Sequence, residues 1–266
     1  MASHDAQQGV MMGQSMLSLI LPVRNVAEHL AASVAEALIV LPRHAASYEL
    51  IIVDDGSRDS TGPLADRLAA RHEPVLVTHR PRAIGFGQAL HEGWRLARGT
   101  HIVATDIGGL SSLSDLGRML ALGEKYTVVL GTRLGRRTSA IARIASRLVG
   151  VELYDPGHRF ALLQAQLAAT LSLENLGSLA HVQLLLRARA SKLATLQLEL
   201  RDLRGWGTGY GPPTLHDLLL LQMSARSGLS SRPAGAILGA GLAAAIGGAW
   251  LLRHTAGERQ RNHDGH

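Results

Sequence analysis

Three aspartates in this chain follow directly on apolar runs. Asp54 and Asp55 end the stretch "YELIIVDD" (48–55), and Asp106 ends "THIVATD" (100–106). A carboxylate in such a position accepts hydrogen bonds from N–H groups and binds divalent cations through its oxygens. Both abilities suit a site that holds a nucleotide. The three aspartates therefore predict a binding site for a phosphate-bearing ligand.

The metal chemistry of this site is incomplete two residues after Asp106. A pair of aspartates in the pattern Asp-x-Asp can hold a divalent cation, but the second position is Gly108, which has no ligand atom. A hard cation such as Mg²⁺ or Mn²⁺ needs several oxygen donors. Asp106 is thus a lone candidate metal ligand. Asp115, nine residues further on, falls on the helix expected to follow.

Arginines offer a second way to neutralise phosphate, because a guanidinium group binds phosphate through two hydrogen bonds. Arg133 ends an apolar run and opens a basic segment, 133–147. The same segment is also compatible with a solvated or lipid-facing helix, so both interpretations stay open. The candidates for phosphate contact are Arg133, Arg136, Arg137, Arg159 and Arg204.

The elements that must position these residues alternate between strand and helix. The expected strands are 17–23, 48–55, 74–79, 100–106, 125–133 and 194–203, and the expected helices are 27–41, 62–72, 87–98, 179–190 and 214–226. The alternation is typical of an α/β fold with a mainly parallel sheet flanked by helices. Such sheets bind ligands at the carboxyl ends of their strands, where the three aspartates lie. Gly85 and Gly87, beside one helix start, let the backbone pass close to a ligand.

The composition narrows the choice of partners. With 266 residues, 46% of them hydrophobic, the chain can bury a large core, and its net charge of +6 favours anionic partners. Aromatic residues make up only 3%, which disfavours nucleic acid as a partner because single strands need stacking platforms. The absence of cysteine excludes thiolate metal sites and disulfides. Residues 1–16 are expected to form a disordered lead-in.

The segment 233–252 differs in kind from the rest of the chain. It carries no charged residue and is long enough to cross a bilayer, since about 20 apolar residues span the hydrocarbon core. Arginines flank it on both sides, and the spacing of Gly235 and Gly239 permits helix pairing, and with it a dimer. We expect a transmembrane helix here, followed by a polar tail, 253–266. The alternative is a buried Ala/Gly-rich core helix.

These features together resemble the family 2 glycosyltransferases, which have the GT-A fold. The resemblance is strongest to the polyprenyl-phosphate sugar transferases of the dolichol-phosphate mannosyltransferase type, and it covers most of residues 17–225. The matching segments, in family order, are "ILPVRN" (20–25), "VDDGSRDST" (53–61), "GFGQAL" (85–90), Asp106, "GTR" (131–133), "DPGHRF" (155–160), "LLLRARASKL" (184–193) and "RGWGTGY" (204–210). The GT-A domain would span 17–226.

The resemblance implies a role for each candidate residue. Those implied to bind the nucleotide and donor are Pro22, Asn25, Asp54, Asp55, Gly85, Gly87 and Asp106. Asp106 and Arg133 are the implied catalytic residues, and Arg133, Arg159 and Arg204 the implied phosphate and acceptor contacts. In the family, the aspartate that corresponds to Asp106 is followed two residues later by a second aspartate, which binds Mg²⁺ or Mn²⁺. In this chain that second position is Gly108. Further departures are Arg24, Val26, Arg159, Ala161 and Gln183.

The implied activity is transfer of a sugar from a nucleoside-diphosphate sugar to a polyprenyl phosphate. It would take place at the cytosolic face of a membrane, with the chain as a single-pass membrane protein whose catalytic domain is cytosolic. A non-catalytic GT-A domain that binds nucleotide or a partner and regulates a genuine transferase is the main alternative. A nucleotidyltransferase or an unrelated doubly wound binding domain is a third.

Overall fold

The computed structural model describes residues 16–133, 140–157, 159–167 and 179–201, together with residues 210, 217, 221 and 222. Several features singled out in the sequence lie outside the described residues. They are most of the lead-in, Arg136, Arg137, Arg204, nearly all of the helix expected at 214–226, the segment 233–252 and the tail 253–266.

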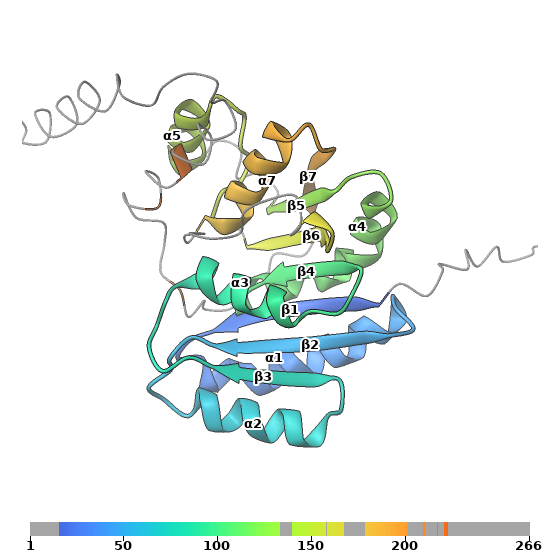
Figure 1. Cartoon of the computed structure of the whole chain (residues 1–266), viewed down its shortest axis with the longest axis vertical. Coiled ribbons are helices and arrows are strands. Elements are labelled where there is room, and N and C mark those ends of the chain that lie inside the picture. The colour runs from blue at the N-terminus through green and yellow to red at the C-terminus, as the bar shows by residue number, and fades with distance from the viewer. Residues whose placement is uncertain are drawn as a thin grey trace, which may run out of the picture. The chain divides into compact units, whose positions relative to one another are not determined.

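The described residues form a seven-stranded sheet in the order β3-β2-β1-β4-β6-β5-β7 (Figure 1). The strands are β1 (Leu17–Val23), β2 (Tyr48–Asp54), β3 (Val75–His79), β4 (His101–Thr105), β5 (Val128–Arg133), β6 (Phe160–Gln164) and β7 (Thr195–Leu200). Every pairing is parallel except those that β6 makes with β4 and β5. The expected mainly parallel α/β sheet is confirmed.

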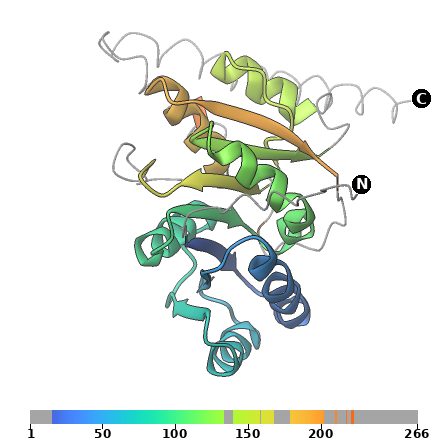
Figure 2. The ribbon, with the colours of Figure 1, turned by 90° about the vertical axis from the view of Figure 1, so that its right-hand side faces the viewer.

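Helices cover both faces of this sheet. They are α1 (Ala27–Val40), α2 (Thr61–Arg71), α3 (Phe86–Leu96), α4 (Leu116–Gly123), α5 (Ala140–Val149) and α7 (Ala180–Ala190), with the 3₁₀ segments η1 (Leu41–Arg43) and η2 (Ile107–Asp115). The view in Figure 2 shows α3 and α1 on opposite sides of the sheet. Burial on both faces explains why the central strands read as continuous apolar runs rather than alternating patterns.

The core consists of two layers, one on each face. One layer packs α3, α5 and α7 against the sheet through residues such as Phe86, Ala145 and Leu184. The other packs α1, α2, η2 and α4 through residues such as Leu30 and Leu113. Because β1, β2, β3 and β4 pair in parallel, their carboxyl ends lie at one edge of the sheet (Figure 1).

Strand β6 is absent from the strands expected in the sequence. Its five residues, "FALLQ", begin at the last residue of the "DPGHRF" segment, and four of the five are buried. Thr105 of β4 pairs with Phe160, and His101 pairs with Gln164. Because β6 runs against its neighbours, its first residue lies at the edge of the sheet where β4 ends. This reversal places Arg159, just before β6, beside Asp106, just after β4.

Within the part of the chain that the structure describes, no helix is both long and apolar enough to span a bilayer. The transmembrane helix expected at 233–252 falls outside that part.

Candidate functional site

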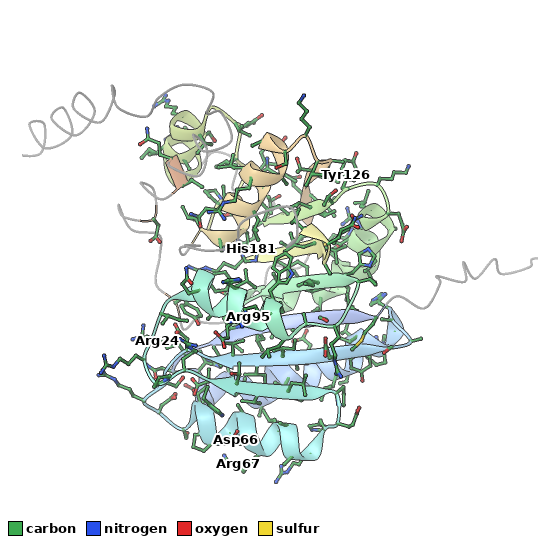
Figure 3. The ribbon with its side chains drawn as sticks, in the orientation of Figure 1. Arg24, Asp66, Arg67, Arg95, Tyr126 and His181 are labelled. Carbon is green, nitrogen blue, oxygen red and sulfur yellow. The ribbon has the colours of Figure 1, made fainter. Side chains whose placement is uncertain are left out.

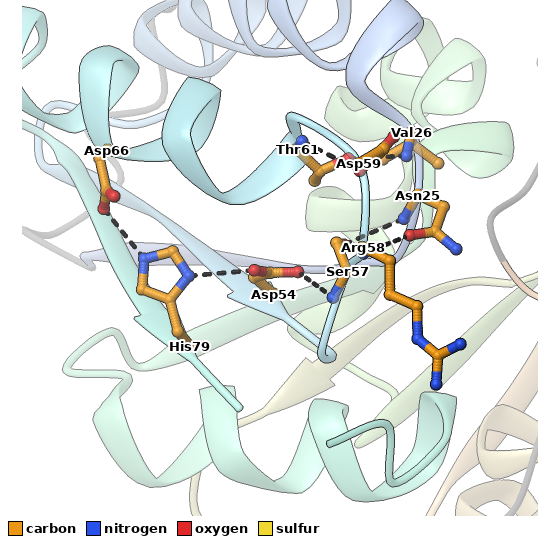
Figure 4. Close-up of polar contacts among 9 residues, drawn as sticks. All are labelled: Asn25, Val26, Asp54, Ser57, Arg58, Asp59, Thr61, Asp66 and His79. Carbon is orange, nitrogen blue, oxygen red and sulfur yellow. Dashed lines mark hydrogen bonds and ion pairs between the residues drawn. The ribbon is translucent and has the colours of Figure 1, made fainter. Parts of the chain in front are cut away.

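Asp54, at the end of β2, is held by two neighbours (Figure 4). One carboxylate oxygen accepts the backbone N–H of Ser57 at 3.0 Å, and the other lies 3.0 Å from Nδ1 of His79, at the end of β3. Nε2 of His79 lies 2.9 Å from Asp66 of α2. The hydrogen bonds to Asp54 and then Asp66 raise the pKa of His79 above its ordinary value. The three side chains form a hydrogen-bonded chain from the end of β2 through β3 to α2.

The loops after β1 and β2 are joined to each other by side-chain hydrogen bonds (Figure 4). Asn25 accepts the backbone N–H of Arg58 at 2.8 Å, and its own N–H donates to the Ser57 hydroxyl at 3.0 Å. The N–H of Val26 donates to the Thr61 hydroxyl at 2.8 Å. Asn25 has a φ of +50°, a left-handed conformation that asparagine tolerates better than most residues. The two loops therefore form one rigid rim above β1 and β2.

Asp55 is fully buried and anchors the start of α3. Its carboxylate accepts the backbone N–H groups of Ile84 at 2.6 Å and Gly85 at 3.0 Å. Gly85 has a φ of +89°, which few other residues adopt, and it leads directly into α3. Gly87 lies buried in the first turn of that helix. Asp55 therefore ties the glycine loop to the end of β2.

Asp106 forms a buried ion pair with Arg159. One oxygen of its carboxylate accepts the N–H of Gly109 at 2.9 Å, and the other lies 3.0 Å from Nη1 of Arg159. Asp106 is 2% exposed and Arg159 is 5% exposed. Burial raises the pKa of the Asp106 carboxyl, and the charge of Arg159 opposes that shift. The hydroxyl of Thr105 donates to the Arg159 carbonyl at 2.8 Å and secures the backbone on either side of the pair.

Aromatic rings surround the guanidinium group of Arg159. Its central carbon lies 5.1 Å from the ring centre of Phe86 and 5.9 Å from that of Tyr210. Phe86 also stacks on His181 of α7, whose Nε2 is 2.8 Å from the carbonyl oxygen of Ala104. Burial and then the charge of Asp55 raise the pKa of Tyr210, with smaller influences from Asp106 and Arg159. These groups therefore share one electrostatic environment.

Arg133, at the end of β5, makes a bidentate ion pair with Asp155. Its Nε lies 2.7 Å from one carboxylate oxygen and its Nη2 lies 3.2 Å from the other. Asp155 is buried, whereas the Arg133 side chain remains 36% exposed. The hydrogen bond to Asp155 raises the pKa of Arg133, and the charge of Asp106 adds to this shift. Arg133 is thus a rigidly oriented cation that a ligand can still reach.

The donor set at this edge does not fit a divalent cation. Both oxygens of Asp106 are already engaged, one of them by a guanidinium group, and Gly108 offers no ligand atom. Asp115 does not substitute, because its carboxylate contacts Arg118 at 2.5 Å and the backbone N–H of Arg201 at 2.5 Å. Among the described residues there is no cluster of three or more His, Cys, Asp or Glu side chains suited to a metal.

The structure brings most of the predicted site residues to one edge of the sheet. Those at or just beyond the carboxyl ends of β1, β2, β4 and β5 are Pro22, Asn25, Asp54, Asp55, Asp106 and Arg133. Gly85 and Gly87 join them through Asp55, and Arg159 through Asp106. Figure 3 shows Arg24 on the same side, beyond the arrowhead of β1. Arg204 lies outside the described residues.

Sequence reasoning missed the partners of these residues. His79, Asp155 and Tyr210 are not among the sequence candidates, although each contacts a predicted residue. His79 ends an expected strand, and Asp155 opens the "DPGHRF" segment, so both positions carried a signal in the sequence. Tyr210 closes the "RGWGTGY" segment and offered a second one.

The comparisons with known proteins assign the family. The pattern of glycosyl transferase family 2 matches residues 18–160, more than half of the chain. This chain belongs to that family.

Two curated relatives illustrate the range of similar proteins. A dolichyl-phosphate beta-glucosyltransferase of Trichomonas vaginalis is 27% identical over 131 residues, which cover 45% of this chain and 40% of the relative. An undecaprenyl-phosphate 4-deoxy-4-formamido-L-arabinose transferase of Pseudomonas fluorescens is 30% identical over 169 residues, which cover 57% and 49%. The chain therefore spans less than half the length of these relatives.

Solved structures confirm the GT-A-like fold. Glucosyl-3-phosphoglycerate synthase of Mycobacterium tuberculosis superposes with a TM-score of 0.59 at 20% identity, covering 83% of this chain and 82% of that one. The same enzyme has been solved with Mn²⁺ and uridine diphosphate, with a TM-score of 0.58 at 18% identity, covering 81% and 77%. At this identity the likeness establishes the fold alone.

Proposed function

We propose that this chain is a glycosyltransferase that moves a sugar from a nucleoside-diphosphate sugar to a polyprenyl phosphate. The observation that carries the proposal is the gathering of Asp55, Asp106, Arg133 and Arg159 at the carboxyl edge of a family 2 glycosyltransferase domain. The relatives named above are transferases that act on dolichyl phosphate and undecaprenyl phosphate by name. The comparisons give no support to a non-catalytic nucleotide-binding domain.

The nucleoside would bind over the rim formed by the loops after β1 and β2. Pro22 and Asn25 lie on one of these loops, and Asp54 and Asp55 on the other. Each carboxylate oxygen carries two lone pairs, so an oxygen of Asp54 or Asp55 that already takes part in one hydrogen bond can accept another from the base or ribose. Gly85 has no side chain, and the space beside its Cα is open, which leaves room for the nucleotide before α3.

The transfer itself would be a single displacement. An acceptor phosphate oxygen attacks the anomeric carbon, the bond from that carbon to the donor phosphate breaks, and the nucleoside diphosphate leaves with the electron pair. A phosphate monoester is largely ionised at neutral pH, with a second pKa of about 6, so the nucleophile needs no strong base. The protein would contribute positioning and positive charge through Arg133, Arg159 and Arg204.

The acceptor would reach this site from a membrane. We propose that 17–226 is the catalytic domain on the cytosolic side and that 233–252 is a single transmembrane helix that holds it there. The basic segment 133–147 would then face anionic headgroups or the acceptor phosphate. The Gly235 and Gly239 spacing would allow two such helices to pair.

The test is a transfer assay on the purified full chain in detergent micelles. Radiolabelled UDP-sugars and GDP-sugars are offered with a polyprenyl phosphate, and label that becomes extractable into organic solvent is measured. We expect one donor class to support transfer. Asp106→Ala should abolish transfer, because it removes the carboxylate that holds Arg159 in place.

The matched control for charge is an arginine pair. Arg133→Ala should lower transfer strongly, because it removes an oriented cation from the site. Arg67→Ala removes an exposed cation on α2, away from the strand ends (Figure 3), and should leave transfer unchanged. Absence of transfer and of nucleotide binding with every donor would refute the proposed function.

A further inference from the structure

The carboxylate that would bind a divalent cation in this fold is already occupied in this chain. Asp106 accepts the Gly109 N–H through one oxygen and contacts Arg159 through the other, at 2.9 and 3.0 Å. A divalent cation at this carboxylate would need to displace Arg159 or lie directly against its positive charge. Either outcome is unfavourable at a position where Asp106 is only 2% exposed.

Arg159 is fixed in this position rather than resting there by chance. Its backbone carbonyl accepts the Thr105 hydroxyl at 2.8 Å, and its guanidinium group packs over the ring of Phe86 at 5.1 Å. A side chain at Gly109 would meet the Arg159 carbonyl oxygen at 2.6 Å, so the glycine is needed for this close approach. Thr105, Phe86 and Gly109 therefore hold both the backbone and the side chain of Arg159 in place.

Other charged side chains lie near the Asp106–Arg159 pair. Asp106 adds to the rise in the pKa of Arg133, and Arg24 acts on Tyr210 together with Asp106 and Arg159. The cations at this edge are thus guanidinium groups. Arg24 and Arg133 are partly exposed and can hydrogen bond to phosphate, whereas the buried Arg159 acts on it through its charge. A guanidinium group in a low-dielectric site acts on a neighbouring charge over several ångströms.

We infer that Arg159 takes the place of the divalent cation, so that this chain binds the diphosphate of its donor without metal. The inference rests on the proposed function. Arg159 acts here as a positioning and charge-compensating residue. It holds Asp106 and supplies the positive charge that a metal ion would bring, since Gly108 has no ligand atom to help bind one.

The first test uses the unmodified full chain in detergent. Binding of UDP and GDP is measured by calorimetry with excess EDTA and again with excess MnCl₂. We expect the dissociation constant of the better nucleotide to differ by no more than about twofold between the two conditions, well below the 1.4 kcal/mol of a tenfold change. Nucleotide binding that strengthens tenfold or more with Mn²⁺ overturns the inference.

A direct metal readout accompanies the calorimetry. The electron paramagnetic resonance signal of free Mn²⁺ is titrated with protein, with and without nucleotide. If Mn²⁺ does not alter nucleotide affinity, nucleotide cannot alter Mn²⁺ affinity, because the coupling is reciprocal. We expect no nucleotide-dependent loss of the free Mn²⁺ signal beyond that of nucleotide alone, and a stoichiometric loss contradicts the inference.

The second test restores the missing carboxylate. Gly108 is half-buried and its φ is not left-handed, so Gly108→Asp is compatible with the backbone. With Arg159 in place, the nucleotide affinity of Gly108→Asp should not change when Mn²⁺ is added. Gly108→Asp combined with Arg159→Gln should gain about tenfold in nucleotide affinity on adding Mn²⁺. Metal dependence in Gly108→Asp alone would show that Arg159 does not exclude the cation.

The two proposals fail in different ways. If the chain binds nucleotide and transfers sugar only with Mn²⁺, the inference is wrong and the proposed function stands. If it binds no nucleotide under any condition, both are wrong. The experiment on the unmodified chain decides between these outcomes even if the Arg159 variants do not fold.

Discussion

Asp106→Asn is a sharp test of the buried pair because it separates charge from shape. The amide keeps the size of the carboxylate and an oxygen that can accept the N–H of Gly109. It removes the negative charge that lies 3.0 Å from the Arg159 guanidinium group. Since Arg159 is only 5% exposed, water cannot take over this role. We therefore expect a large loss of stability.

The magnitude follows from the geometry. Two unit charges 3.0 Å apart attract by about 5 kcal/mol at an effective dielectric constant of about 20. Removing one partner of a buried pair typically costs about 3–5 kcal/mol. A folded domain of about 200 residues loses roughly 2–4 °C in Tm per kcal/mol, so Tm should fall by about 6–20 °C.

The assay compares thermal and urea unfolding of purified variants by circular dichroism near neutral pH. Asp66→Asn is the matched control, since Asp66 makes an ion pair of 2.9 Å but is 63% exposed, and we expect it to cost less than about 1 kcal/mol. The double variant Asp106→Asn with Arg159→Gln should recover part of the loss, because it removes both charges. A cost below about 1 kcal/mol for Asp106→Asn, or simple additivity in the double variant, would refute the reasoning.

Three further predictions test other parts of the site. Gly109→Ala should lower the free energy of unfolding by about 2 kcal/mol, because the added Cβ would lie 2.6 Å from the Arg159 carbonyl oxygen. Gly117→Ala is the control: its Cβ would meet only the ring of His44, which can move, and the change measured by urea unfolding should be less than about 0.5 kcal/mol. Arg133→Lys should lower kcat/KM for transfer about tenfold, because lysine keeps the positive charge but cannot make the bidentate contact. Its Tm should change little. An unchanged kcat/KM would count against a role of Arg133 in transfer. The raised pKa of His79 means that its stabilising contribution is complete below the unfolded value of 6.5 and is lost as pH rises through the folded value. His79→Gln should therefore reduce the stability difference between about pH 5.5 and 8.5 by about 0.5 kcal/mol, because the ring is partly exposed, and an unaltered difference would contradict this assignment.

The parallel half of the sheet could be predicted from the sequence because its signals are local. The run that forms β2 is apolar on both faces and ends at Asp54, and the run that forms β4 ends just before Asp106. Alternation of these strands with helices fixes their direction, since parallel neighbours need a crossover. The edge that gathers the aspartates then follows from the topology alone.

The pairing at that edge could not be predicted, because it depends on contacts between distant residues. Asp106 and Arg159 are 53 residues apart, and only the reversed direction of β6 makes them neighbours. A five-residue apolar strand next to a loop motif gives no periodic signal of its direction. The sequence shows that Gly108 lacks a ligand atom and offers Arg159 as one of five candidate phosphate contacts, but it does not show that Arg159 pairs with Asp106.

The reversed strand β6 also determines when the site is finished during synthesis. Strands β1 to β4 emerge from the ribosome first and can pair as one continuous layer, with Asp106 at its edge. The arginine that neutralises this aspartate is made 53 residues later, a delay of roughly 3–10 s at about 5–20 residues per second. Until β6 arrives, the outer edge of β4 has no partner strand and can pair with another chain. The nascent protein is therefore most vulnerable to misassembly in the interval when its future donor site already carries Asp106 but lacks the arginine that neutralises it.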